Sequence, residues 1–169
     1  MKKIFYNDDN LKREDIDETV TRLKALIVNS NNQILLGYSH KTFQFPGGHL
    51  EQNETLDEGL IRELREETGM VFNSEIFEPF QVIKYYSKNY RNGGKNRENY
   101  IYYYLIKTDE SINLENTHYD EYELAGNYEL IYVDLKDVVG VLKESVVDNP
   151  INEIIVKEML TALENSEML

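Results

Sequence analysis

The order of elements along the sequence predicts an α/β protein of the α+β type, in which helices cover a mixed β-sheet. Runs of β-branched, aliphatic and aromatic residues, separated by turn residues, are typical of strands. Two segments with apolar residues at helical spacing, one early and one late, are typical of helices that pack on a sheet. No internal repeat or low-complexity linker divides the 169 residues, so we expect a single domain over residues 1–169.

The first strands are predicted on the two sides of a polar turn. Thr19–Ser30 is rich in β-branched and aliphatic residues, and Asn29–Asn32 has the composition of a turn. Gln33–Ser39 is the predicted return strand of a hairpin. Phe43–Phe45 then leads into Pro46–Gly48, a sequence that ends regular structure.

Further strands and a late helix are predicted in the second half of the chain. Ser74–Ser87 and Glu98–Thr108 are long β-like runs, and the glycine-containing Asn92–Asn96 between them indicates a hairpin turn. Tyr128–Leu135 is another predicted strand. Ile151–Asn165 has apolar residues at helical spacing and is predicted to be a C-terminal helix.

The early helix is predicted from its period and its ends. Thr55 is the expected N-cap, and Glu58 three residues later completes a capping box. Gly69 suits the left-handed position that follows a last helical turn. The apolar stripe consists of Leu56, Leu60, Ile61 and Leu64.

Composition and charge restrict the classes of function. The chain is 41% hydrophobic, has no cysteine and carries a net charge of −13. It has no apolar run near the roughly 20 residues of a membrane helix and no apolar core of a signal peptide, so we expect a cytoplasmic protein with no membrane partner. Its negative charge disfavours general nucleic-acid binding. Phosphates would be handled through bound cations.

The acidic face of the early helix is either a metal-binding site or a solvated surface. Glu63, Glu66 and Glu67 lie at i, i+3 and i+4, so their carboxylates share one arc of roughly 100° and repel one another. A hard divalent cation such as Mg²⁺ or Mn²⁺ would turn this repulsion into binding, and Arg62 could orient a carboxylate. Taken alone, the six residues 62–67 favour the alternative, a salt-bridged and solvated surface helix.

The whole segment resembles the Nudix box. That motif is a glycine, five residues, a glutamate, seven residues, and Arg-Glu-aliphatic-x-Glu-Glu-x-Gly-aliphatic. Its positions are filled here by Gly48, Glu54, Arg62, Glu63, Leu64, Glu66, Glu67, Gly69 and Met70. If each fixed residue occurs at roughly 6%, a chance match in this chain is on the order of one in a million or less.

The resemblance implies a fold, an activity and a set of site residues. Nudix hydrolases have a mixed sheet between helices, an α/β/α sandwich, and cleave the diphosphate linkage of a nucleoside diphosphate derivative with Mg²⁺ or Mn²⁺. The implied metal ligands are the carbonyl of Gly47 and the carboxylates of Glu63, Glu66 and Glu67. The implied catalytic residues are Glu54, Arg62, Glu63 and Glu66. Family members differ in which acid is the general base, so that assignment stays open.

Residues outside the box give weaker candidates. His40 and His49 flank the Pro-Gly-Gly loop and are candidates for substrate contact, although loop histidines often have no role. Arg91 and Arg97 belong to a basic run, Lys84–Arg97, that would either attract an anionic substrate or form an ordinary solvated hairpin tip. The distant-base candidates are Asp120, Glu121 and Glu123, with a solvated acidic loop as the alternative.

The leading hypothesis is therefore a pyrophosphohydrolase that acts on a small-molecule nucleotide. A nucleoside triphosphate and a nucleotide sugar or ADP-ribose are equally favoured as substrates. The alternative is a non-catalytic nucleotide-binding sensor domain that retains the fold, and a purely structural acidic helix comes third. A homodimer through the tyrosine-rich strands or the C-terminal helix is compatible with the sequence.

Overall fold

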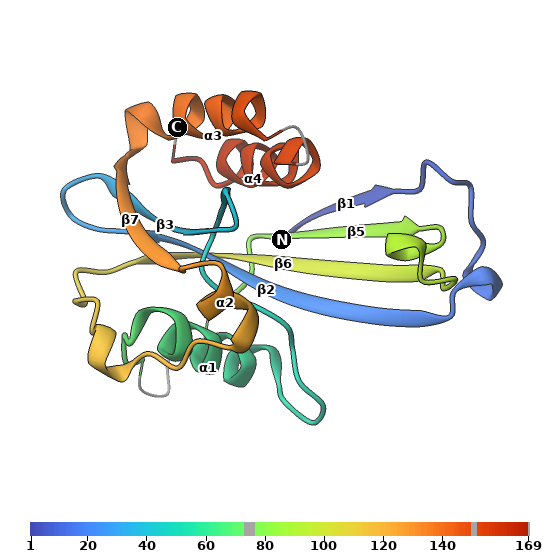
Figure 1. Cartoon of the computed structure of the whole chain (residues 1–169), viewed down its shortest axis with the longest axis horizontal. Coiled ribbons are helices and arrows are strands. Elements are labelled where there is room, and N and C mark those ends of the chain that lie inside the picture. The colour runs from blue at the N-terminus through green and yellow to red at the C-terminus, as the bar shows by residue number, and fades with distance from the viewer. Residues whose placement is uncertain (73–76, 150–151, 169) are drawn as a thin grey trace.

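The computed structural model describes residues 1–72, 77–149 and 152–168. Within them a 7-stranded sheet has the order β1-β5-β6-β2-β3-β4, with β7 paired to β3 (Figure 1). The strands are β1 (Lys2–Tyr6), β2 (Glu18–Val28), β3 (Gln33–Ser39), β4 (Thr42–Gln44), β5 (Gln81–Ser87), β6 (Arg97–Lys107) and β7 (Glu129–Asp134). The helices are α1 (Leu56–Thr68), α2 (Glu121–Ala125), α3 (Leu135–Asp148) and α4 (Glu153–Asn165), with short 3-10 turns at Arg13–Asp15, Tyr90–Asn92 and Leu114–Asn116.

Strands β2 and β6 form the long centre of the sheet. They run parallel and stay in register from the pair Glu18–Arg97 to the pair Val28–Lys107. β5 is antiparallel to β6, joined through the predicted turn, and β1 is parallel to β5. The sheet is therefore mixed, as predicted. A parallel pair needs a long connection, and the connection between β2 and β6 contains α1.

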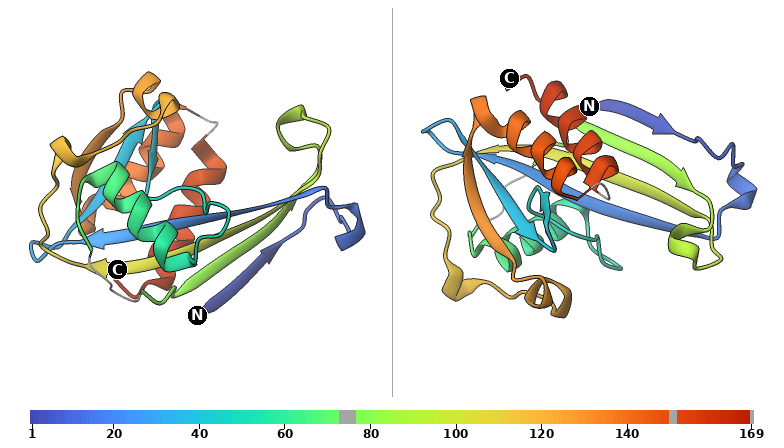
Figure 2. Two further views of the ribbon diagram at one scale, coloured as in Figure 1. Left: turned by 90° about the horizontal axis from the view of Figure 1, so that it is seen from below. Right: turned by 45° about the horizontal axis from the view of Figure 1, so that its top comes forward.

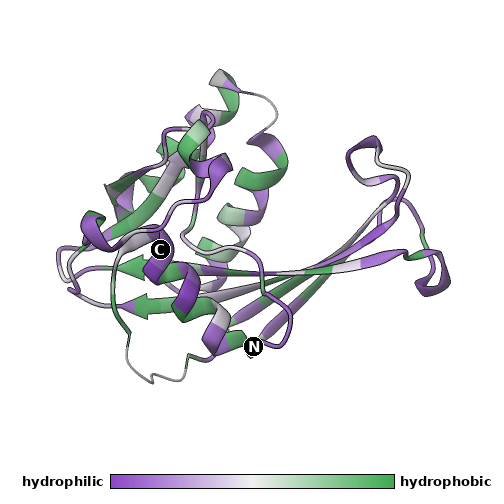
Figure 3. Ribbon diagram, turned by 60° about the horizontal axis from the view of Figure 1, so that its bottom comes forward, coloured by the Kyte–Doolittle hydropathy of each residue, from purple (hydrophilic) through white to green (hydrophobic). Residues whose placement is uncertain are grey.

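Helices cover both faces of the sheet, which confirms the predicted layers. α3 and α4 lie on one face and α1 on the other (Figure 1 and Figure 2). Side chains of β2 alternate between the two cores: Leu23, Ala25 and Ile27 pack with α1, whereas Leu26 and Val28 pack with α3 and α4. Figure 3 shows the hydrophobic ends of the central strands beneath the helices.

Helix α1 begins and ends where the sequence predicts. The Thr55 side chain accepts from the Glu58 N–H, and the Glu58 carboxylate accepts from the Thr55 N–H at 2.8 Å. Gly69 has φ 67° and donates to the Arg65 carbonyl at 2.9 Å. Leu60 and Leu64 are fully buried. Local capping thus fixes the position of the acidic face along the chain.

One predicted strand and one predicted strand pairing differ from the structure. β5 begins at Gln81 rather than Ser74, because Pro79 has no N–H to donate to a neighbouring strand; residues 73–76 of that prediction lie outside the described residues. β2 and β3 are antiparallel but pair at one position, Val28–Ile34, so the predicted hairpin is short. β2 pairs mainly with β6, and β3 pairs with β4 and β7.

Four elements of the described residues were not predicted, although α3 has apolar residues at helical spacing, Leu135, Val138, Val139 and Leu142. These are β1, the short β4 and α2, and α3, which follows β7 directly. The N-cap of α3, Asp134, makes no side-chain capping hydrogen bond. The predicted C-terminal helix is confirmed over Glu153–Asn165, and its predicted first residue, Ile151, lies outside the described residues. In the described part of the chain, no helix is both long and apolar enough to cross a membrane.

The outer ends of β1, β5, β6 and β2 extend beyond the helices (Figure 2) and are held by a buried carboxylate. Glu98 is 2% exposed. It accepts hydrogen bonds from Arg13 at 2.9 Å, Thr19 at 3.0 Å and Tyr100 at 3.1 Å, and forms an ion pair with Lys84 at 2.8 Å. These partners come from β2, β5, β6 and the turn before β2, so one side chain links the N-terminal segment to the sheet.

We expect Glu98→Ala to lower the free energy of unfolding by about 1–3 kcal/mol, because it removes a buried carboxylate that accepts from four side chains. Urea denaturation measures the change. Glu14→Ala is the matched control, since the Glu14 side chain is 71% exposed and its one ion pair, to Lys12, spans 3.8 Å. Equal unfolding midpoints for the two variants would show that the Glu98 cluster does not stabilise the fold.

Candidate active site

The loop between β4 and α1 is fixed against β2. Because β2 leaves β3 after one pair, its backbone is available to the loop: the N–H groups of Leu23 and Ala25 donate to the carbonyls of Gly48 and Pro46, each at 2.9 Å. Gly47 has φ +119°, and a Cβ on it would lie 2.2 Å from the Leu23 carbonyl oxygen. Glycine is therefore required at this approach.

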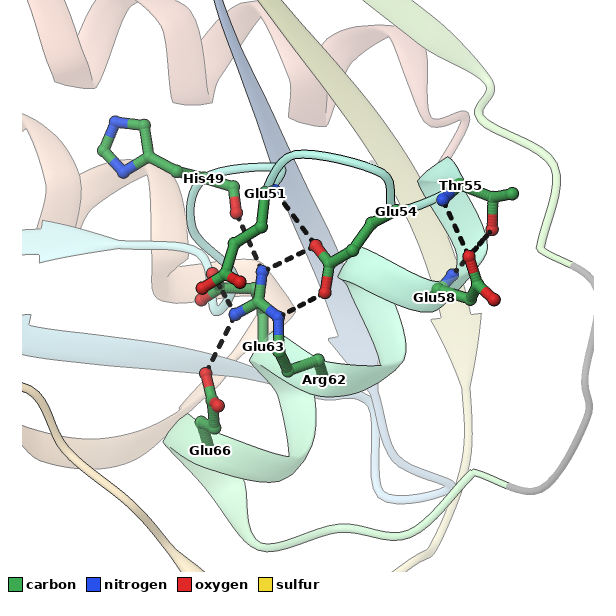
Figure 4. A network of polar contacts seen from close by, with 8 residues as sticks. All are labelled: His49, Glu51, Glu54, Thr55, Glu58, Arg62, Glu63 and Glu66. Carbon is green, nitrogen blue, oxygen red and sulfur yellow. Dashed lines mark hydrogen bonds and ion pairs between the residues drawn. The ribbon is translucent and has the colours of Figure 1, made fainter.

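Arg62 joins the acids of the early helix to the loop (Figure 4). Its Nε and Nη2 donate to the two carboxylate oxygens of Glu54 at 2.6 and 2.9 Å. Its Nη1 donates to Glu63 at 2.8 Å and Glu66 at 2.9 Å, and Nη2 also donates to the His49 carbonyl at 2.9 Å. The hydrogen bonds from Arg62 lower the pKa of Glu54. The expectation that Arg62 orients a carboxylate therefore has a structural basis in these contacts.

Glu67 is the buried carboxylate of the group, with 3% exposure. One of its oxygens accepts from the Gly47 N–H at 2.7 Å and from the Tyr128 hydroxyl at 2.9 Å. Burial raises the pKa of Glu67 to about 8. The Lys24 ammonium donates to the Gly47 carbonyl and, at 3.4 Å, to Gln44; burial lowers the pKa of Lys24, while nearby Glu67 and Glu63 favour its charged form.

A cavity of about 340 Å³ opens beside these groups, within the size range of small-molecule sites. Several predicted site residues line it: Gly47, Glu63, Glu67, His40, His49, Arg91, Asp120 and Glu123. Others do not: Glu54, Arg62, Glu66, Arg97 and Glu121. Arg97 is held by Glu18 at 2.6 Å, and Glu121 is exposed on α2. Arg62 donates hydrogen bonds to Glu54 and Glu66 and also to Glu63, which lines the cavity.

One side of the cavity is positively charged. His49 Nε2 accepts from Arg22 Nε at 3.2 Å. Burial, followed by the charges of Arg22, Lys24, Arg97 and Arg91, lowers the pKa of His49 to about 4, so this imidazole is neutral near pH 7. Because this side is cationic and the α1 side is acidic, the cavity suits an anionic ligand bridged to the glutamates by a cation.

His40 also lines the cavity. Its ring stacks on Tyr122 with 4.2 Å between centroids, and its Nε2 lies 2.9 Å from the Tyr122 carbonyl oxygen. The pair connects β3 to α2, the short helix that carries Glu123 into the cavity.

Lys24, Tyr128 and Arg22 are site residues that the sequence analysis did not identify. Lys24 is a charged residue within the apolar run Leu23–Val28, and an isolated charge in a central strand could have indicated a buried partner. Tyr128 and Arg22 have no such feature in the sequence. Tyr128, just before β7, and Arg22, on β2, reach the site through tertiary packing.

The oxygen atoms around Lys24 are suited to a divalent cation. Carboxylates of Glu63 and Glu67 and the Gly47 carbonyl are hard oxygen donors of the kind that Mg²⁺ and Mn²⁺ prefer, and Glu63 and Glu67 both lie close enough to Lys24 to favour its charge. In the described residues, no three Asp, Glu or His side chains converge on a point as metal ligands. A metal ion would compete with Arg62 and Lys24 for the same oxygens.

We expect Gly48→Ala to reduce activity by up to about 100-fold, because a small displacement of a site group has effects of that order. A Cβ at this position would lie 2.2 Å from a carboxylate oxygen of Glu63. The end of that flexible side chain can move, so the protein should still fold. Steady-state kinetics and thermal unfolding measure the two properties.

Gly140→Ala on α3 is the matched control, since a Cβ there meets no atom within 4 Å. If Gly48→Ala and Gly140→Ala were equally active, the placement of Glu63 against Gly48 would not matter for the reaction.

The chain is similar in sequence and in structure to known proteins. The NUDIX domain model matches residues 20–150. An RNA pyrophosphohydrolase of Pasteurella multocida (strain Pm70) is 25% identical over 143 residues, which cover 77% of this chain and 71% of the relative. The sheet and helices are similar to those of a MutT protein from a study of Aliivibrio salmonicida and Vibrio cholerae, with TM-score 0.51 and 18% identity over 82% of this chain and 96% of that one. They are also similar to a C. elegans Ap4A hydrolase, with TM-score 0.52 and 15% identity over 87% and 95%.

Proposed function

The chain belongs to the NUDIX domain family and is a hydrolase of phosphorus anhydrides, and from this we infer that it is a divalent-metal-dependent pyrophosphohydrolase of a small nucleotide. The observation that carries the proposal is the buried Glu67 carboxylate, held by Gly47 and Tyr128 at the wall of the cavity. A buried acid with a raised pKa in a cleft is a common property of catalytic sites.

We assign the metal to Glu63, Glu66, Glu67 and the Gly47 carbonyl. Mg²⁺ or Mn²⁺ bound there would neutralise the diphosphate and lower the pKa of a bound water. The placement of Glu63, Glu67 and the Gly47 carbonyl around Lys24 supports this assignment. A cation bound to Glu63 and Glu66 would displace Arg62 from them. Tyr128 orients Glu67 through its hydroxyl.

Glu123 is the distant acid that we propose as a general base, in preference to Glu121. Glu123 lines the cavity, whereas Glu121 does not. Burial raises the pKa of Glu123, and Glu67 lies beside it. A carboxylate with a raised pKa is better matched to proton abstraction near neutral pH.

The substrate that we propose is a nucleoside diphosphate derivative, either a nucleoside triphosphate or a nucleotide sugar of the ADP-ribose type. Arg22, His49 and Arg91 on the cationic side of the cavity support an anionic ligand. The negative charge of the rest of the chain favours a small ligand over a nucleic-acid strand.

The test is phosphate release from nucleoside triphosphates, ADP-ribose, nucleotide sugars and dinucleoside polyphosphates, with Mg²⁺ or Mn²⁺ and with chelator. We expect turnover of one class that requires the metal and stops with chelator. Turnover that persists in chelator would contradict the metal assignment. Nucleotide binding by folded protein, with no product from any compound, would favour the non-catalytic sensor.

A further inference from the structure

The cavity has a second end that the proposed reaction does not use. It lies against α4, where apolar side chains from two elements and a loop form the wall: Phe45 in the loop after β4, Ile101 and Tyr103 on β6, and Ile155 and Met159 on α4. One carboxylate of α4, Glu158, lines this end. A mostly apolar wall with a few polar groups is typical of a site for a flat organic group such as a nucleobase.

Glu158 has unused capacity to accept hydrogen bonds. In the described part of the chain it forms no ion pair. Burial raises its pKa to about 7, and the positive charges of Arg22 and Lys24 on β2 oppose this shift. Tyr85 on β5 and Tyr103 on β6 also face Glu158. A half-buried carboxylate without a partner carries a cost that a ligand with N–H donors would remove.

Arg22 has N–H donors available for a ligand, which complements the acceptor oxygens of Glu158. It lines the same cavity and faces Glu158. It donates to His49 at 3.2 Å and to the Tyr90 hydroxyl at 3.5 Å. Among the described residues it has no carboxylate in ion-pair contact. A guanidinium has five N–H donors, so donors remain for a ligand beside the acceptor oxygens of Glu158.

We propose that the α4 end of the cavity is a guanine subsite, in which Glu158 accepts from N1–H and the 2-amino group and Arg22 donates to O6. Guanine presents two adjacent donors and an acceptor along one edge, and an ionised carboxylate is a bidentate acceptor. Adenine presents one donor next to an acceptor, so one oxygen of Glu158 would face a lone pair. The inference rests on the proposed function and narrows its substrate to a guanine nucleotide.

The test measures binding without turnover. Calorimetric titration with GMP, IMP and AMP compares bases that differ at the proposed contacts, since IMP lacks the 2-amino group and AMP also lacks N1–H and O6. We expect GMP to bind roughly 10- to 100-fold more tightly than IMP and AMP, the effect of one or two unsatisfied buried groups. Glu158→Gln should remove most of this preference and leave AMP binding nearly unchanged.

Glu164→Gln, at an exposed position of the same helix, is the matched control and should retain the preference. Thermal unfolding confirms that both variants fold. Equal binding of the monophosphates to the wild type, no measurable binding of any of them, or a GMP preference that survives in Glu158→Gln would each overturn the guanine subsite.

Kinetics separates this inference from the proposed function. Metal-dependent hydrolysis of GTP, ITP and ATP at equal kcat/KM would overturn the guanine subsite and leave the pyrophosphohydrolase intact. A GMP preference that requires Glu158, in a protein that hydrolyses none of the phosphate compounds, would support the subsite and overturn the enzyme.

Discussion

Glu67→Gln is expected to lower turnover by about 10²- to 10⁴-fold while the protein remains folded, because a metal ion held by this carboxylate supplies several kcal/mol of transition-state stabilisation. Glutamine has the shape of glutamate, and its carbonyl oxygen can still accept from the Gly47 N–H or the Tyr128 hydroxyl that contact Glu67. It lacks the negative charge that binds a cation or takes a proton. Steady-state kinetics with Mg²⁺ and circular dichroism measure activity and fold separately.

Glu144→Gln on α3 is the control for Glu67→Gln, because Glu144 is exposed and lies on a different helix. It should have wild-type activity. Comparable turnover in Glu67→Gln and the wild type would exclude Glu67 from the reaction. It would restore the interpretation of the acidic helix as a structural element.

Arg62→Ala is expected to lower kcat/KM by about 100-fold and the free energy of unfolding by about 1–3 kcal/mol. Arg62 holds both oxygens of Glu54 and one oxygen each of Glu63 and Glu66, and its side chain is 23% exposed. Without it these carboxylates repel one another and move apart. Kinetics at several Mg²⁺ concentrations and urea denaturation measure the two effects.

Arg65→Ala is the matched control for Arg62→Ala, since Arg65 is exposed on the same helix. Arg62→Lys should recover part of the stability but little of the rate, because one ammonium cannot replace the planar fork that reaches several acceptors. Full activity in Arg62→Lys would show that the charge at this position suffices and that the geometry of the guanidinium does not matter.

Local sequence determined what could be predicted about the fold. α1 was predicted with its ends because Thr55, Glu58 and Gly69 act on neighbouring backbone groups. The parallel pairing of β2 with β6 joins residues that are far apart in sequence, so no local pattern encodes it. α3 starts without a capping side chain, directly after β7, so its start is unmarked, and the helical spacing of Leu135, Val138 and Leu142 was the signal that could have revealed it.

In the site, too, residues that are close in sequence could be predicted, whereas residues brought in by tertiary packing could not. Glu54, Arg62, Glu63 and Glu66 come together because the loop and one helix carry all of them, so their spacing is sufficient. Lys24 comes from β2, Tyr128 from the residue before β7 and Glu158 from α4, and their positions depend on how those segments pack. The homodimer and the cytoplasmic location stay predictions.

The alternation of side chains along β2 restricts how the length of this chain can vary. Leu23 and Ala25 face the α1 core, whereas Arg22 and Lys24 line the cavity. Inserting or deleting one residue within β2 would exchange these faces over part of the strand, burying an ammonium among leucines and removing the cation beside Gly47. Insertions should therefore be tolerated in the turns at the outer ends of the strands, where residues such as Gly94 are exposed with no atom within 4 Å of a Cβ.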